Sequence, residues 1–269
     1  MKISLRTIIY ITILCIAAGI GLNILLHEKP ARTAESSSTF TIGILPDESS
    51  QIIHHKFDPV IQYLSAKTNR TIQLILPTNY NELVKLFGDK KIDMAYFGGL
   101  TYIRAHHHYG ATPLIMRDVD AQFSSVFFSK HNQKSLELSD FKGKRFTFGD
   151  RLSTSGHLMP RHFMKSELTQ TPELFFSEVN YSSTHDQTVY QVMNDKADIG
   201  VTNALIFKQM IGDGRLNAED VDVLWETPPY VDYVWAVQGD MNEEHKIMLR
   251  DAFLTLDDDD EKQKAILDN

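Results

Sequence analysis

The stretch Phe-Gly-Asp-Arg-Leu-Ser-Thr-Ser-Gly at residues 148–156, continued by His-Leu-Met-Pro-Arg to residue 161, joins an apolar, strand-like run to a helical one. Ser153 is a suitable helix N-cap, and the free backbone N–H groups after it point along the helix axis. Thr154 and Ser155 add two more hydroxyls beside it. Such a turn is a compact set of donors for an oxyanion, assisted by the helix dipole. On these residues alone, an ordinary capped helix remains the alternative.

Strand-like and helical patterns alternate on both sides of this turn. Asp58-Pro59 is typical of a cap followed by proline at the first helical position, so it predicts a helix start there. The alternation predicts an α/β fold with parallel sheets flanked by helices. We expect strands at 40–45, 72–76, 92–97, 145–149, 179–182, 197–202 and 230–237, and helices at 57–64, 83–87, from 100, from 154, and at 185–193, 204–211 and 243–256.

The length of 269 residues suits two modest α/β lobes. We expect lobe 1 at 35–127, lobe 2 at 128–235 and a return to lobe 1 at 236–269. This organisation predicts two crossings, near Phe127 and near Trp235. Because ligands of open α/β sheets bind beyond the carboxyl ends of the strands, the cleft should be lined by residues just after the strands.

The N-terminus combines Lys2 and Arg6 with an apolar run at 8–26, which predicts a targeting or anchoring segment at 1–34, including a linker. A 19-residue helix is about 28 Å long, close to the hydrocarbon thickness of a bilayer. An uncleaved anchor is favoured over a cleaved signal, and either places the rest of the chain outside the cytoplasm, in the periplasm. The single cysteine, Cys15, lies in this run, so it is interpreted as a membrane-helix cysteine and excludes an intrachain disulfide.

The composition and the histidine clusters argue against several other classes. A formal net charge of -8 argues against nucleic-acid binding, which needs a clustered basic surface, and the sequence shows no such cluster. Neighbouring histidines at 54–55 and 106–108 point in different directions on a helix, so we expect solvated residues there and no metal site. The acidic run at 257–260 lacks the pattern of a calcium loop and is interpreted as a solvated turn. We expect no cofactor.

Four motifs, in order along the chain, resemble one known family. They are Tyr80 with the helix after it, 92–99 (Ile-Asp-Met-Ala-Tyr-Phe-Gly-Gly), 148–161, and His-Asp at 185–186 before a helix that leads to Ala-Asp-Ile-Gly at 197–200. Together they resemble the periplasmic substrate-binding proteins of phosphate, phosphite and phosphonate ABC transporters. The resemblance implies a two-lobed, type II-like periplasmic-binding-protein fold with two interlobe crossings.

The resemblance also implies which residues bind the ligand. Ser153, Thr154 and Ser155, with Gly156, match the hydroxyls and amides that hold the phosphorus-bound oxygens. Two further donors match positions elsewhere in the chain: Tyr80, from the opposite lobe, and His185. For both residues, the alternative interpretation is that the side chain only occupies the start of a helix and binds no ligand.

Two positions depart from the family's amino-phosphonate binders, and a third is uncertain. Phe123 stands where those proteins have a tyrosine donor, and Leu205 stands where they have a glutamate for a ligand ammonium. A leucine cannot pair a buried cation, so a smaller or uncharged substituent is favoured over an aminoalkyl one. Asp232, shortly before the second crossing, is an acceptor candidate, and a plain loop aspartate is as good an interpretation.

These observations predict a monomeric solute-binding protein that captures a small phosphorus oxyanion and delivers it to an ABC transporter permease. The alternative is a sensing domain of the same fold that signals to a membrane kinase or receptor. An enzyme is not expected, because the chain has no Gly-x-Ser-x-Gly elbow and its serines stand in a group of equivalent donors.

Overall fold

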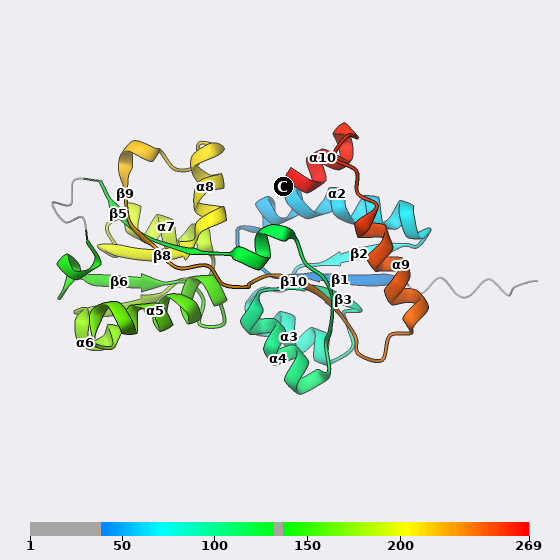
Figure 1. Cartoon of the computed structure of the whole chain (residues 1–269), viewed down its shortest axis with the longest axis horizontal. Coiled ribbons are helices and arrows are strands. Elements are labelled where there is room, and N and C mark those ends of the chain that lie inside the picture. Colours follow the sequence, from blue (N-terminus) through cyan, green and yellow to red (C-terminus); the bar gives the residue numbers. More distant parts are fainter. Residues whose placement is uncertain (1–38, 132–136, 269) are drawn as a thin grey trace, which may run out of the picture. The chain divides into compact units, whose positions relative to one another are not determined.

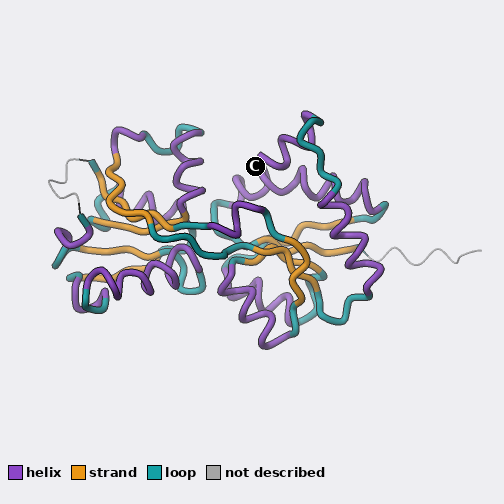
Figure 2. Tube along the Cα trace, in the orientation of Figure 1, coloured by secondary structure: helices purple, strands orange, loops and turns teal. Residues whose placement is uncertain are grey.

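The computed structural model describes residues 39–131 and 137–268, and they form an α/β fold with two five-stranded sheets (Figures 1 and 2). The first sheet has the order β2 (Ile72–Ile75), β1 (Phe40–Ile44), β3 (Met94–Phe97), β10 (Val234–Val237) and β4 (Thr112–Ile115). The second has the order β7 (Glu178–Tyr181), β6 (Arg145–Phe148), β8 (Ile199–Asn203), β5 (Ser125–Lys130) and β9 (Val221–Glu226).

Helices cover both faces of the first sheet (Figure 1). α2 (Ser50–Thr68), α9 (Glu243–Leu254) and α10 (Glu261–Asp268) lie on one face, and α3 (Tyr80–Gly88) and α4 (Gly99–Tyr109) lie on the other. The three central strands, β1, β3 and β10, are buried on both sides: Ile42, Met94 and Ala236 are fully inaccessible to solvent. Near-continuous apolar runs are what such doubly covered strands require, which explains why the sequence shows no polar alternation there.

The second sheet has the same layered construction. α7 (His185–Met193) and α8 (Ala204–Gly212) enclose one apolar cluster, and α5 (Met159–Leu168) and α6 (Pro172–Phe175) enclose another on β6 and β8. The short helices are η1 (Asp118–Gln122), η2 (Leu138–Phe141), η4 (Ala218–Asp220) and the π-helical turn η3 (Thr154–Leu158), which leads directly into α5.

Both sheets are mixed, whereas the sequence predicted parallel ones. β1 pairs in parallel with β2 and β3, but β10 is antiparallel to β3 and β4. In the second sheet, β6 pairs in parallel with β7 and β8, but β5 is antiparallel to β8 and β9. The antiparallel strands β5 and β10 are those that follow a passage from the other sheet, so they enter in the reverse direction.

The two passages between the sheets run side by side. Phe123 and Tyr230 form an antiparallel bridge, with N–H donors 2.7 and 2.9 Å from the opposite carbonyl oxygens. The boundaries predicted at 127 and 235 need correction, because they fall inside β5 and β10 rather than between the sheets. The apolar run around Phe127 belongs to the second sheet, and the passages are 116–124 and 227–233. The division into lobes as separate domains stays a prediction.

One predicted helix start is wrong. α2 begins at Ser50, so Pro59 lies inside the helix and does not start it. The segment predicted as an anchor at 8–26 lies outside the described residues. Among the residues that are described, no helix is long and apolar enough to cross a bilayer.

Candidate functional site

The hydroxyl-rich turn follows β6, at the carboxyl end of the strand. Ser153 has an extended backbone and caps the helical turn, and its Oγ accepts a hydrogen bond from the Gly156 N–H at 2.9 Å. Gly156 packs against the backbone of Gly149: a Cβ on Gly156 would lie 3.0 Å from the Gly149 Cα and 2.9 Å from the Ser153 Oγ. Gly156 therefore allows a close backbone approach that fixes the turn.

The three hydroxyls of the turn are all buried, but they have different partners. Ser153 is used as the cap, and the Thr154 Oγ1 accepts a hydrogen bond from the Leu100 N–H of α4 at 3.0 Å. The Ser155 Oγ finds no hydrogen-bond partner among the described residues, although the side chain is only 1% exposed. A buried unpaired hydroxyl costs about 1–3 kcal/mol, so Ser155 offers a donor that a ligand would satisfy.

His185, the first residue of α7, lies beside this turn. Its backbone N–H donates to the Asp47 carbonyl oxygen at 2.8 Å, and its Nδ1 accepts from the Asn203 N–H at 3.3 Å. Burial, assisted by the charge of Lys56, lowers the pKa of the imidazole to about 3. The ring is therefore neutral, and because Nδ1 is an acceptor the proton is on Nε2. That atom is buried without a partner among the described residues, so His185 supplies a second free donor.

Asp232 contributes an acceptor to the same region. Its Oδ1 accepts a hydrogen bond from the Gly99 N–H at the start of α4, at 2.9 Å. Its Oδ2 is buried and lacks a partner among the described residues. Burial raises the pKa of this carboxyl to about 6, although the Gly99 N–H and the nearby hydroxyls of Thr154 and Ser155 lower it.

Tyr80 begins α3 after the N-cap Asn79, and its ring is part of the core of the first sheet. Burial raises the pKa of its hydroxyl, and the negative charges of Asp47 and Asp150 raise it further, whereas the Ser153 hydroxyl lowers it. The hydroxyl end thus lies in the electrostatic field of both the first-sheet loop and the hydroxyl-rich turn. Tyr80 therefore begins a helix, as the alternative interpretation expected, and its hydroxyl also lies close to the candidate site.

Asp47 was missed by sequence reasoning. It lies three residues after the end of β1 and accepts a hydrogen bond from the Tyr233 hydroxyl at 2.8 Å. The Asn203 amide donates to that same hydroxyl at 3.1 Å. Burial, and then the charge of Glu48, raises the pKa of Asp47 to about 7. Its position at the carboxyl end of the first strand was the signal that could have found it.

The two departing positions lie close to this site but play different parts. Phe123 is buried and packs against the rings of Tyr230 and Tyr233, at centroid distances of 6.3 and 5.4 Å. Leu205, the second residue of α8, is partly exposed and lines a gap with Tyr96 of the first sheet. Phe123 therefore packs where the two passages pair, and Leu205 faces the first sheet across the gap.

Several polar contacts join the two sheets' units around the site. The Ser49 N–H donates to the Asp186 carboxylate at 3.2 Å, and Arg215 pairs with Glu48 at 2.9 Å. Glu48 also pairs with Lys56, which donates to the Gln209 side chain of α8 at 2.8 Å. These contacts describe a closed arrangement, in which residues after the strands of both sheets face one another.

The clusters considered as metal ligands have ordinary surroundings in the described residues. His54 lies 3.1 Å from Asp58 on the exposed face of α2, and the His106 Nδ1 lies 2.8 Å from the Ala111 carbonyl oxygen. The carboxylates of Asp257, Asp258 and Asp259 are exposed and lie within 4.8 Å of one another. Exposed acidic groups on a turn need no ion, and the absence of a metal site stays a prediction.

The chain is similar to several known proteins. A family model described as "ABC transporter, phosphonate, periplasmic substrate-binding protein" matches residues 42–269. The probable ABC transporter phosphite binding protein PhnD1 of Prochlorococcus marinus (strain MIT 9301) is 30% identical over 238 residues, which cover 84% of this chain and 80% of that protein. The phosphate-import protein PhnD of Mycolicibacterium smegmatis is 25% identical over 81% of this chain and 72% of that protein.

The structural likeness agrees with the sequence matches. The structure of Prochlorococcus marinus PhnD1 in complex with methylphosphonate superposes with a TM-score of 0.80 at 28% identity, covering 86% of this chain and 89% of that one. A binding protein component of an ABC phosphonate transporter from Pseudomonas aeruginosa has the same fold, with a TM-score of 0.76 at 20% identity over 86% and 78% of the two chains. The family match spans nearly all of the described residues. The chain therefore belongs to the periplasmic substrate-binding proteins of phosphonate ABC transporters.

Proposed function

We propose that the protein captures a small phosphorus oxyanion, a phosphonate, phosphite or phosphate, between its two sheets for delivery to an ABC importer. The observation that carries the proposal is the set of buried polar atoms without partners among the described residues. Those that belong to the candidate site are the Ser155 Oγ and the His185 Nε2, which donate, and the Asp232 Oδ2, which accepts. An oxyanion with a P–OH group would satisfy all three at once.

The chemistry of the site favours a phosphorus acid over a fully ionised anion such as sulfate. Asp232 needs a donor opposite its Oδ2, and a singly protonated phosphorus oxyanion supplies that proton together with acceptor oxygens. The Thr154 Oγ1 accepts from the Leu100 N–H and keeps its own hydrogen to donate, and Tyr80 is a further candidate donor from the first sheet's unit. These site residues match the assignments that the family resemblance implies, and their roles in binding remain our proposal.

Transport rather than sensing is the function we favour, because the family is that of a transporter component. The family also implies an extracytoplasmic location, and it is not a family of enzymes. Anchoring through residues 8–26 and a monomeric state are further parts of the proposal.

Calorimetric titration with phosphate, phosphite, methylphosphonate, aminoethylphosphonate and sulfate tests the proposal. We expect binding of at least one phosphorus oxyanion and none of sulfate. Aminoethylphosphonate should bind more weakly than methylphosphonate, because Leu205 gives its ammonium no partner. Failure of every phosphorus ligand to bind folded protein would contradict the proposed function.

A further inference from the structure

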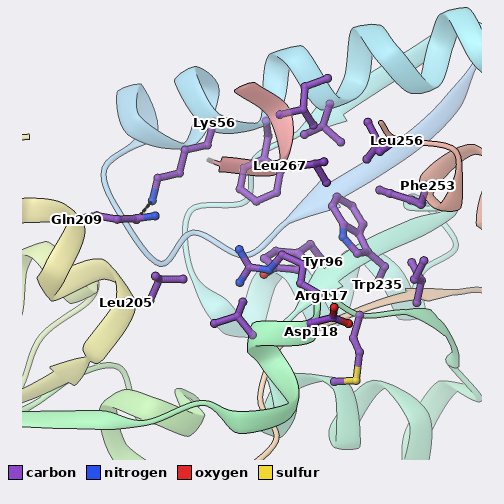
Figure 3. Close-up of a pocket in the computed structure, with 16 residues that line it drawn as sticks. Lys56, Tyr96, Arg117, Asp118, Leu205, Gln209, Trp235, Phe253, Leu256 and Leu267 are labelled. Carbon is purple, nitrogen blue, oxygen red and sulfur yellow. Dashed lines mark hydrogen bonds between the residues drawn. The ribbon is translucent and has the colours of Figure 1, made fainter. Parts of the chain in front are cut away.

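A cavity of about 500 Å³ opens beside the candidate site, between α2, α9 and α10 of the first sheet and α8 of the second (Figure 3). Its floor is aromatic: Tyr96 packs against Phe57 and Trp235, with centroid distances of 5.4 and 4.8 Å. Its volume lies within the range of about 300–1,000 Å³ typical of small-molecule sites. The oxyanion donors are not among its lining residues, so the proposed binding of a phosphorus group makes no use of it.

A narrow gap adjoins this cavity on the side of the candidate site. Six residues line both spaces, namely Lys56, Phe57, Tyr96, Arg117, Leu205 and Gln209. The far end of the gap is bounded by Asp47, Asn203 and Tyr233. Asn203 and Asp47 both bond to the His185 backbone or ring, so the gap runs from the neighbours of His185 to the aromatic floor.

Two charged side chains, Arg117 and Lys56, line both the gap and the cavity, and both are already paired. Arg117 makes two hydrogen bonds of 2.8 Å to the buried carboxylate of Asp120, and its guanidinium lies over the Tyr96 ring. Lys56 is paired with Glu48, and it donates to the Gln209 side chain, a hydrogen bond that Figure 3 shows. A second anionic group on a ligand would have to break these pairs, and the Asp118 carboxylate also lines the cavity. An uncharged, apolar group would instead pack between Leu205 and the aromatic rings.

We infer that this cavity receives the organic substituent of a phosphonate whose phosphorus group is bound at the candidate site. The ligand class is then an alkyl- or arylphosphonate with an uncharged substituent longer than methyl. This inference rests on the proposed function. The position of the gap argues for this occupant, because one end is bounded by Asp47 and Asn203, which bond to His185, and the other by Leu205 and the aromatic floor of the cavity.

Calorimetric titration of the full chain with methyl-, propyl- and hexylphosphonate tests the inference. Burial of each added methylene should tighten the dissociation constant about four-fold while the chain is entering the cavity. Excess phosphate must displace hexylphosphonate, which shows that the phosphorus group occupies the oxyanion site and not a separate apolar surface.

Two tryptophan variants locate the substituent. Val119→Trp adds a large side chain at the partly exposed rim of the cavity and should reduce the advantage of hexyl- over methylphosphonate by ten-fold or more. Leu174→Trp, at a leucine that is 74% exposed on α6, is the matched control and should keep that advantage.

The outcomes separate the two proposals. If methylphosphonate or phosphate binds but hexylphosphonate binds no more tightly, the inference is overturned and the proposed function stands. If hexylphosphonate is preferred equally in Val119→Trp and Leu174→Trp, the substituent lies elsewhere and the inference is also overturned. If no phosphorus ligand binds, the proposed function itself fails.

Discussion

Replacement of Ser155 by alanine should weaken the binding of phosphate or methylphosphonate without harm to the fold. The side chain is 1% exposed, and its Oγ has no hydrogen-bond partner among the described residues. Its carbonyl oxygen, which accepts from the Ser125 hydroxyl at 2.7 Å, is unaffected by the substitution. The change therefore removes one donor from the site, together with a hydroxyl that lies near the Asp232 carboxylate and the Tyr230 hydroxyl.

The magnitude follows from the charge of the ligand and from the burial of the hydroxyl. A hydrogen bond to a charged group contributes about 1.5–3 kcal/mol, so the dissociation constant should rise about ten- to a hundred-fold. The free energy of unfolding without ligand should stay the same or increase slightly, because an unpaired buried hydroxyl is itself unfavourable.

Calorimetric titration gives the dissociation constants, and thermal denaturation without ligand gives the stabilities. Ser129→Ala is the matched control, since Ser129 on β5 is also fully buried with an unpartnered hydroxyl but belongs to no part of the site. It should alter stability as Ser155→Ala does and leave affinity unchanged. Equal affinities for the wild type and Ser155→Ala, or equal losses in both variants, would refute the assignment of Ser155 to the oxyanion.

Three further predictions concern selectivity, pH and closure. Leu205→Glu should raise the affinity for aminoethylphosphonate relative to that for methylphosphonate by about ten-fold, as measured by calorimetry, because a carboxylate at the gap pairs with the ligand's ammonium. Asp47→Asn should raise the melting temperature more at pH 8 than at pH 4.5. The folded pKa of about 7 lies above the unfolded value of 3.8, so the wild-type carboxyl disfavours folding as pH rises through that window. Arg215→Ala should weaken phosphonate binding several-fold and expand the liganded protein in X-ray scattering, because it removes the contact with Glu48 across the cleft.

Each of these has a result that would contradict it. An unchanged ligand ranking in Leu205→Glu would mean that the side chain does not face the ligand. A stabilisation by Asp47→Asn that is independent of pH would contradict the burial of an ionisable carboxyl. Arg145→Ala is the control for Arg215→Ala, because it breaks a pair with Asp198 that lies within the second sheet's unit. Equal losses of phosphonate affinity in the two variants would contradict a role of Arg215 in closing the cleft.

The order of strands and helices was predictable because apolar runs and helical spacing depend on local sequence, but two features depended on tertiary packing. The helix start at Pro59 was wrong because Ile53 and Phe57 continue the buried face of α2 before the proline. Packing of that extra length offsets the roughly 3 kcal/mol that an internal proline costs. The crossing near Phe127 was misplaced because an apolar run buried on both faces gives no indication of which sheet it joins.

The candidate site was predictable where it depends on a single turn and not where it depends on closure. Resemblance identified the turn, and the cap at Ser153 is confirmed, but Asp47 and Tyr233 meet only because the passages bring distant segments together. Their separation in the chain is 186 residues, and neither lies in a motif. A carboxylate whose partner comes from so far away cannot be distinguished from a loop aspartate by spacing.

The three hydroxyls of the turn are a second case in which the sequence alone does not predict the hydrogen-bond partner of each side chain. In the sequence they are equivalent neighbours, and a set of convergent donors is the natural interpretation. Ser153, however, is a cap with an extended backbone, whereas Thr154 and Ser155 belong to the helical turn after it, so the three side chains leave the backbone in different directions. Ser153 accordingly turns back to cap the helix, Thr154 reaches α4, and Ser155 is left unpaired. The donor set of the oxyanion must therefore be completed from other elements, which is why His185 and Tyr80 matter to the site as much as the turn itself does.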